Sequence, residues 1–225
     1  MSLRRLKETV RALLRADAFE AGLEALAAMP ERRVINPLFG LLYDGDTLTR
    51  WRAVSAMGRV TARLAEREPE SARVIMRRLM WNLNDESGGI GWGSPEAMGE
   101  IMACHFGLAQ EYAAILISFL DPRGNYLEHE VLQRGVLWGV GRLARVRPHL
   151  AESAGPLVGA FFDALDPELR GLGLWAALPL PGARGQERIA ALHRDSAEID
   201  IYEDGRLNRY SIARLAEMAA GLPRH

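Results

Sequence analysis

Several residue types and patterns are scarce in this chain of 225 residues, and each scarcity excludes a class of protein. Cys104 is the single cysteine, so the chain can form neither an internal disulfide nor a multi-cysteine metal site. Apolar runs stay shorter than the about 18 residues that a membrane span needs. The first residues, MSLRRLKETVRALLR, lack the apolar core of a secretory signal. We therefore expect a soluble, cytoplasmic protein.

An excess of positive charge is also missing. The 28 basic residues are balanced by 29 acidic ones, which gives a net charge of -1. Such a chain has no global field that would draw it to phosphate backbones, and this argues against a nucleic-acid partner. Hydrophobic residues make up 48% of the chain, enough to bury one sizeable core, so we expect a single domain over residues 1–225.

Apolar residues recur at helical spacing along most of the chain, which predicts an all-α protein. We divide it into N-terminal helices over 1–45, a repeat core over 46–182 and a C-terminal cap over 183–225. The core is predicted to contain paired helices over 47–65 and 71–83, 94–106 and 110–120, and 128–146 and 148–165, followed by a helix over 167–177. Ser94-Pro95-Glu96 is predicted to supply an N-cap and a proline at the first helical position.

Internal repetition is the most informative feature of this core. Gly58, Gly99 and Gly141 occupy equivalent positions, 41 and 42 residues apart, and this spacing is close to the about 40–47 residues of a HEAT or armadillo unit. Small residues at these places let two helix backbones approach, which explains glycine inside a helix. The spacing predicts a right-handed α-α superhelix, a HEAT-like solenoid.

The repeated segments resemble the HEAT-repeat superfamily, particularly the short bacterial repeats also found in phycobilisome lyases. The Arg-x-x-Ala-x-x-x-Gly-like pattern of those repeats is matched loosely by Arg52, Ala56 and Gly58 and by Arg134 and Gly141. The resemblance covers roughly residues 40–180, and the second copy has no matching arginine. It implies an interaction surface and no particular partner.

The last residues depart from the repeat pattern. Ile199 and Ile201 alternate with acidic residues, and Asp204-Gly205 supplies a two-residue turn, which predicts a small β-hairpin. Ser211 is predicted to cap a final helix. We expect this appendage to cover the apolar face of the last repeat.

The segment from Glu86 to Ser94 holds four glycines and Trp92, and it is the least ordinary loop. It can be read as a binding loop or as a loop that packs Trp92 into the neighbouring helices. We expect the concave surface to recognise a protein segment through five residues, with Trp92 as the apolar anchor, the glutamates meeting cations and the arginines meeting carboxylates: Trp92, Glu96, Glu100, Arg52 and Arg134.

The alternative is an enzyme, or enzyme subunit, that binds a metal or small ligand. Its site would combine carboxylates and imidazoles that can ligate a transition metal, namely Glu96, Glu100, His105 and His129. Cys104 and His105 are sequence neighbours about 100° apart on a helix, which is unsuitable for a nucleophile–base pair, and we place Cys104 in the core. The scaffold prediction is non-catalytic and includes no cofactor.

Overall fold

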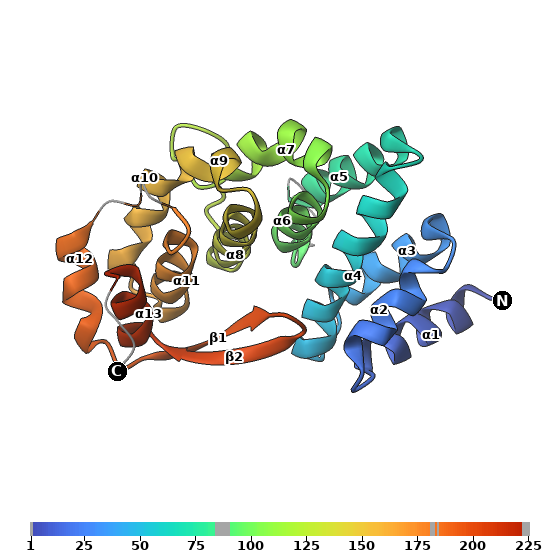
Figure 1. The fold of residues 1–225 in the computed structure, drawn as a ribbon, viewed down its shortest axis with the longest axis horizontal. Helices are drawn as coiled ribbons and strands as arrows, with labels where there is room; N and C mark the ends of the chain where they lie inside the picture. Colours follow the sequence, from blue (N-terminus) through green and yellow to red (C-terminus); the bar gives the residue numbers. More distant parts are fainter. Residues whose placement is uncertain (1, 84–90, 181–182, 184, 222–225) are drawn as a thin grey trace.

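The computed structural model describes residues 2–83, 91–180, 183 and 185–221, and it shows a solenoid of helices (Figure 1). The chain begins with α1 (Leu3–Arg15), α2 (Phe19–Ala27) and α3 (Glu31–Leu41). The inner helices of the following arc are α4 (Thr47–Ala65), α6 (Ser94–Cys104), α8 (Glu130–Val146) and α11 (Pro167–Ala177). Within the described ranges, no helix is both long and apolar enough to cross a membrane.

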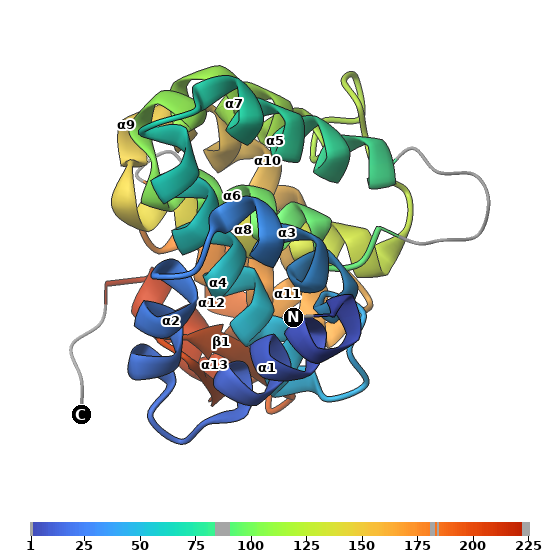
Figure 2. The same cartoon turned by 90° about the vertical axis from the view of Figure 1, so that its right-hand side faces the viewer.

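A second, outer layer of helices covers the convex side of the arc (Figure 2). It consists of α5 (Pro69–Leu83), α7 (Phe106–Ser118), α9 (Pro148–Ala151) and α10 (Gly155–Val158). The largest fully buried side chains of the hydrophobic core include Trp138, Trp175 and Phe162. The HEAT-like, all-helical architecture predicted from the repeats is confirmed.

Two local predictions need correction. The expected helix over 148–165 is replaced by α9, α10 and two short 3-10 turns, and Pro156, which has no backbone N–H to donate, lies in the first turn of α10. Ser94 is not an N-cap: Gly93, with φ 74°, holds that position, and no side chain caps α6. The buried Ser94 hydroxyl instead lies 3.5 Å from the amide nitrogen of Asn82.

The three repeated glycines lie where successive inner helices touch. A Cβ added at Gly58 would lie 2.5 Å from Cγ of Glu100, and one at Gly99 would lie 2.4 Å from Cα of Gly139. At Gly141 it would lie 2.6 Å from the Trp175 ring. The spacing of these glycines therefore marks real helix contacts, as predicted.

The C-terminal part consists of α12 (Gln186–Ala191), a hairpin of β1 (Glu198–Glu203) and β2 (Arg206–Ser211), and α13 (Ile212–Ala219). The strands pair antiparallel from Glu198 opposite Ser211 to Glu203 opposite Arg206. Asp204 and Gly205 form the turn with φ 48° and 82°, and the Ser211 hydroxyl accepts from the Arg214 N–H as the helix cap. The predicted hairpin and cap are confirmed.

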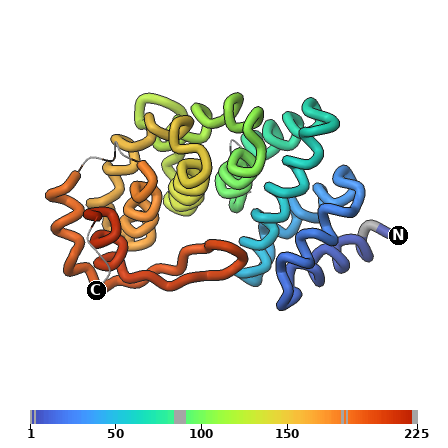
Figure 3. Tube along the Cα trace, viewed as in Figure 1, coloured from blue at the N-terminus to red at the C-terminus, as the bar shows by residue number. Residues whose placement is uncertain are grey.

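The hairpin reaches farther than the last repeat. Its base packs on α11, where Ile199 fills the space beside Gly171, but its tip extends across the open side of the arc to α4 (Figure 3), where Gly205 lies against Phe19 of α2. A strand of six residues spans about 20 Å, long enough to bridge several inner helices. The appendage therefore contacts the last repeat and also reaches the N-terminal helices, a contact that was not predicted from the sequence.

Candidate functional site

The middle of the hairpin is attached to the inner helices through Tyr202. Its ring stacks on Trp51 of α4 with a centroid distance of 5.2 Å, and its hydroxyl lies 2.8 Å from Oγ of Ser55. Its carbonyl oxygen accepts from Nε1 of Trp138 on α8 at 3.0 Å. Because Tyr202 is buried between them, the hairpin divides the concave face into two sides.

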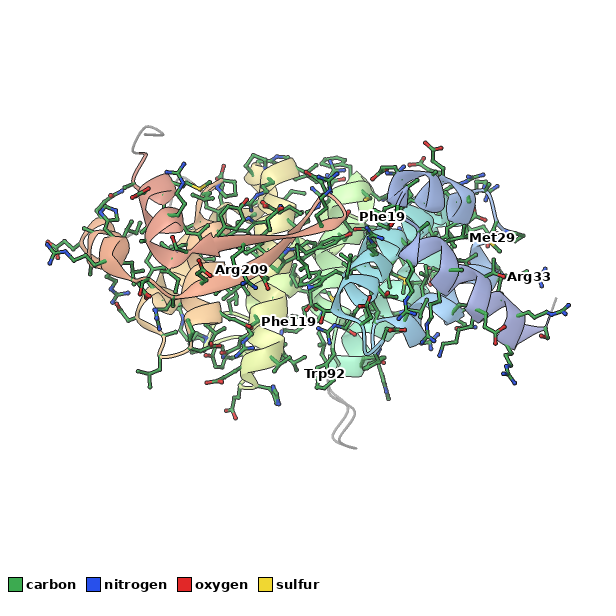
Figure 4. The ribbon with its side chains drawn as sticks, turned by 90° about the horizontal axis from the view of Figure 1, so that it is seen from below. Phe19, Met29, Arg33, Trp92, Phe119 and Arg209 are labelled. Carbon is green, nitrogen blue, oxygen red and sulfur yellow. The ribbon has the colours of Figure 1, made fainter. Side chains whose placement is uncertain are left out.

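The tip of the hairpin is held at the N-terminal helices, close to Phe19 (Figure 4). Arg52 donates to the Gly205 carbonyl at 3.1 Å and also to the carbonyls of Leu14 and Ala16. Its guanidinium lies 4.7 Å from the centre of the Phe19 ring. Arg52 thus connects the N-terminal helices to the C-terminal hairpin. The sequence had predicted that Arg52 would contact a partner protein.

On one side of the hairpin lies a cavity of about 230 Å³, lined in part by Glu100, Arg142, Arg145 and Trp175. Arg142 donates two hydrogen bonds to the buried Glu100 carboxylate, at 2.6 and 3.2 Å. Arg145 lies 3.4 Å from the Trp175 ring centre and donates to two backbone carbonyls. Glu100, predicted to meet a partner's cation, therefore has its cation within the chain.

Cys104 also lines this cavity, and it is exposed, so its predicted place in the core is wrong. Desolvation by the surrounding groups and the Glu100 carboxylate raise the pKa of the Cys104 thiol to about 12. At neutral pH the thiol stays protonated and is a weak nucleophile. The neighbouring His105 uses Nδ1 to accept the Leu108 N–H and places Nε2 3.5 Å from Glu66.

On the other side of the hairpin lies the Trp92 groove, which we define as the hollow of about 140 Å³ lined by Arg50, Trp51, Val54, Trp92, Gly93, Glu96, Val131 and Leu132. A larger hollow of about 340 Å³ shares Arg50, Trp51, Glu96 and Val131 with it and extends beneath the hairpin to Arg134 and Asp200. Trp92 is 38% exposed and lies at the edge of the molecule (Figure 4).

Glu96 is the least satisfied group of this groove. Its Oε2 atom is buried without a hydrogen-bond partner among the described residues. Burial raises the pKa of Glu96 to about 7, against the weaker opposing effects of its own backbone N–H and of Arg50. The side chain as a whole is half-buried and lies against Gly135 of α8, where an added Cβ would meet the carboxyl group at 2.7 Å.

The structure brings together only part of the predicted binding set. Trp92 and Glu96 line one groove, and Arg134 lines the adjoining hollow, where it pairs with Asp166 at 2.7 Å and with Glu168. Glu100 lies on the other side of the hairpin, and Arg52 is at its tip. In the predicted glycine-rich loop, Glu86 to Ile90 lie outside the described residues.

The four residues of the metal alternative have no shared centre. His129 caps α8, with Nδ1 accepting the Val131 N–H, while Glu100 is bound by Arg142 and His105 lies beside Glu66. In the part of the chain that the structure describes, no three His, Cys, Asp or Glu side chains form a group that could hold a metal.

Tyr202 and Trp51 form a contact that was not predicted from the sequence. Both are aromatic, but nothing local indicates that they stack across most of the chain length. The signal in the sequence is the apolar pair Ile201-Tyr202, which interrupts the alternation of polar and apolar residues, and the structure buries both.

The sequence comparisons do not assign the chain to a family. No protein-family model matches the chain. An uncharacterized protein of Archaeoglobus fulgidus is 31% identical over 111 residues, which are 49% of this chain and 54% of that protein, so the match spans about half of the relative's length.

Two solved structures are similar over nearly the whole chain. A designed armadillo repeat protein in complex with the peptide (KR)4 has a TM-score of 0.53 at 16% identity, covering 96% of this chain and 98% of that one. Another designed armadillo repeat protein has a TM-score of 0.51 at 15% identity, with the same coverage. The similarity to phycobilisome lyases in particular stays a prediction. The chain has the fold of the HEAT-like helical-repeat proteins.

Proposed function

We propose that this protein is a non-catalytic binding scaffold that holds a protein segment in the Trp92 groove. The observation that carries the proposal is the pairing, in one hollow, of an exposed tryptophan with a carboxyl group whose buried Oε2 atom has no hydrogen-bond partner among the described residues. Tryptophan supplies much of the binding energy in many protein interfaces, because it buries a large rigid surface. A designed repeat protein of similar fold is in complex with a peptide, which supports the same class of ligand here.

The hairpin limits the form of this ligand. Because Tyr202 and Gly205 attach β1 and the turn to α4, a partner cannot extend along the whole concave face. The groove and its adjoining hollow have volumes of about 140 and 340 Å³. Such volumes suit a few side chains of a short segment, with Trp92 as the anchor at the rim.

The test is selection of peptides from a random displayed library on the wild-type protein, followed by affinity measurement with Trp92→Ala. We expect binding to weaken at least about tenfold, as for truncation of a hot-spot residue. Trp81→Ala is the matched control, because Trp81 is 77% exposed on the outer helix α5. Circular dichroism checks that both variants fold.

Two results would overturn the proposal. One is a wild-type protein that selects no peptide. The other is a set of peptides whose affinity is unchanged by Trp92→Ala or is lost equally with Trp81→Ala.

A further inference from the structure

The carboxylates around the Trp92 groove differ in whether they already have a cation. Three of them line the groove or the adjoining hollow: Glu96, Glu168 and Asp200. Glu168 pairs with Arg134, and Asp200 pairs with Arg209 at 2.9 Å. Glu96 alone among these three has no ion pair with a described residue, and its Oε2 has no hydrogen bond there.

The positive groups near Glu96 do not supply the missing partner. Arg50 of α4 acts on the Glu96 carboxyl only through its charge, since no hydrogen bond or ion pair joins the two. Arg134 of α8 is held by Asp166 and Glu168 of the α11 end. A buried carboxylate without a bound donor is unfavourable, and a cation entering the groove would relieve it.

The walls of the groove suit a long side chain that ends in a charge. Val131 and Trp92 are partly exposed and offer apolar surface, and Val54, Leu132 and Trp51 also line the groove. Lysine and arginine bury their methylene stems on apolar surface, and their charged ends are attracted to aromatic faces. A short neutral donor such as asparagine has no such stem, and a carboxylate would oppose Glu96.

We propose that the Trp92 groove is a subsite for one lysine or arginine side chain of the bound segment, with the Glu96 carboxylate accepting its N–H groups. This inference rests on the proposed function and specifies its ligand. The positive charge of Arg50 beside Glu96 would repel further cations, which disfavours a densely basic segment.

Small probes test the subsite directly. N-acetyl-arginine amide and N-acetyl-lysine amide are titrated into the protein while NMR follows the indole N–H of Trp92. N-acetyl-citrulline amide is the neutral isostere of the arginine probe. We expect saturable shifts with the cationic probes and at least tenfold weaker binding of the citrulline probe.

Glu96→Gln separates charge from shape in this assay, because glutamine keeps the size and an acceptor oxygen. We expect the variant to bind the arginine and citrulline probes equally weakly. Glu168→Gln, which removes a carboxylate already paired with Arg134, is the control and should keep the preference for arginine. Equal binding of the arginine and citrulline probes by the wild type overturns the subsite, as does an unchanged preference in Glu96→Gln.

The outcomes also separate this subsite from the proposed function. Selected peptides that depend on Trp92 but carry no essential basic residue would leave the scaffold function standing and overturn the cation subsite. Conversely, cationic probes that bind through Glu96, in a protein that selects no peptide, would support the subsite and overturn the scaffold function.

Discussion

Among single residues, Glu96 and Glu100 show how differently two carboxylates on one helix can be used. They are four residues apart on α6, so both lie on the side of this helix that faces the concave surface. The hairpin separates them, and Glu100 receives two hydrogen bonds from Arg142 while Oε2 of Glu96 receives none from a described residue. Two glutamates on the same side of one helix therefore have different environments. Glu100 forms an ion pair within the protein, and Oε2 of Glu96 remains an open acceptor.

Glu96 should make the stability of the protein depend on pH. Its folded-state pKa of about 7 is above the 4.5 of an unperturbed glutamate, so the folded state binds the proton more tightly. This contribution to stability is fully present below pH 4.5 and is lost as pH rises through 7. We expect Glu96→Gln to be more stable than the wild type at pH 8, by about 1–3 kcal/mol, and to lose that advantage at pH 5.

Urea unfolding of both proteins at pH 5 and pH 8 measures this difference. Glu24→Gln is the control, because Glu24 is an exposed glutamate of α2. If the free energy of unfolding depended on pH in the same way in wild type and Glu96→Gln, the burial of this carboxyl would be contradicted.

At the level of the helices, the arc depends on close contacts between neighbouring inner helices. Alanine is a better helix former than glycine by about 1 kcal/mol, so Gly99→Ala would stabilise an isolated helix. In the protein, the new Cβ would lie 2.4 Å from Cα of Gly139, and backbone cannot move aside as a flexible side chain can. The steric effect should therefore outweigh the helix propensity.

We expect Gly99→Ala to lower the free energy of unfolding by about 1–3 kcal/mol, which is typical of an overpacked core. Gly45→Ala is the matched control, because no atom lies within 4 Å of a Cβ added there. Chemical denaturation of both variants gives the comparison. Equal stabilities would show that α6 and α8 are not in close contact.

For the whole molecule, the hairpin acts as a tie between the two ends of an otherwise open arc (Figure 1). HEAT-like solenoids are held mainly by contacts between neighbouring repeats. Here Tyr202 and Gly205 contact residues of the N-terminal half, and Ser55 and Tyr202 are 147 residues apart in the chain. The tie should therefore couple the unfolding of the first and last helices.

Arg52→Ala should uncouple the tip of the hairpin, because it removes the donors to Gly205, Leu14 and Ala16 together. We expect faster hydrogen–deuterium exchange in α1, α2 and the hairpin and little change in α7. Arg4→Ala is the control, since Arg4 is an exposed residue of α1 that pairs only with Glu8 among the described residues. Uniform acceleration along the chain, or none at the tip, would contradict this role of Arg52.

Features that depend on nearby residues could be predicted from the sequence. The helix over 47–65, the turn at Asp204-Gly205 and the Ser211 cap are set by local periodicity, backbone freedom and side-chain hydrogen bonding. The three glycines indicated the helix contacts, because a repeat places equivalent residues at equivalent contacts. The break at Pro156 also has a local cause and could have been predicted.

The division of the concave face was decided by the tertiary structure. Which side of the hairpin Glu96 and Glu100 occupy, and whether Arg52 meets a partner or the Gly205 carbonyl, depends on where the strand tip ends after the helices have stacked. The position of the strand tip depends on the angles between all successive helices along the arc. No local sequence pattern contains this information. The sequence therefore determined which residue types could bind a protein segment. Only the tertiary structure decided which of these residues has an acceptor atom without a hydrogen bond to a described residue.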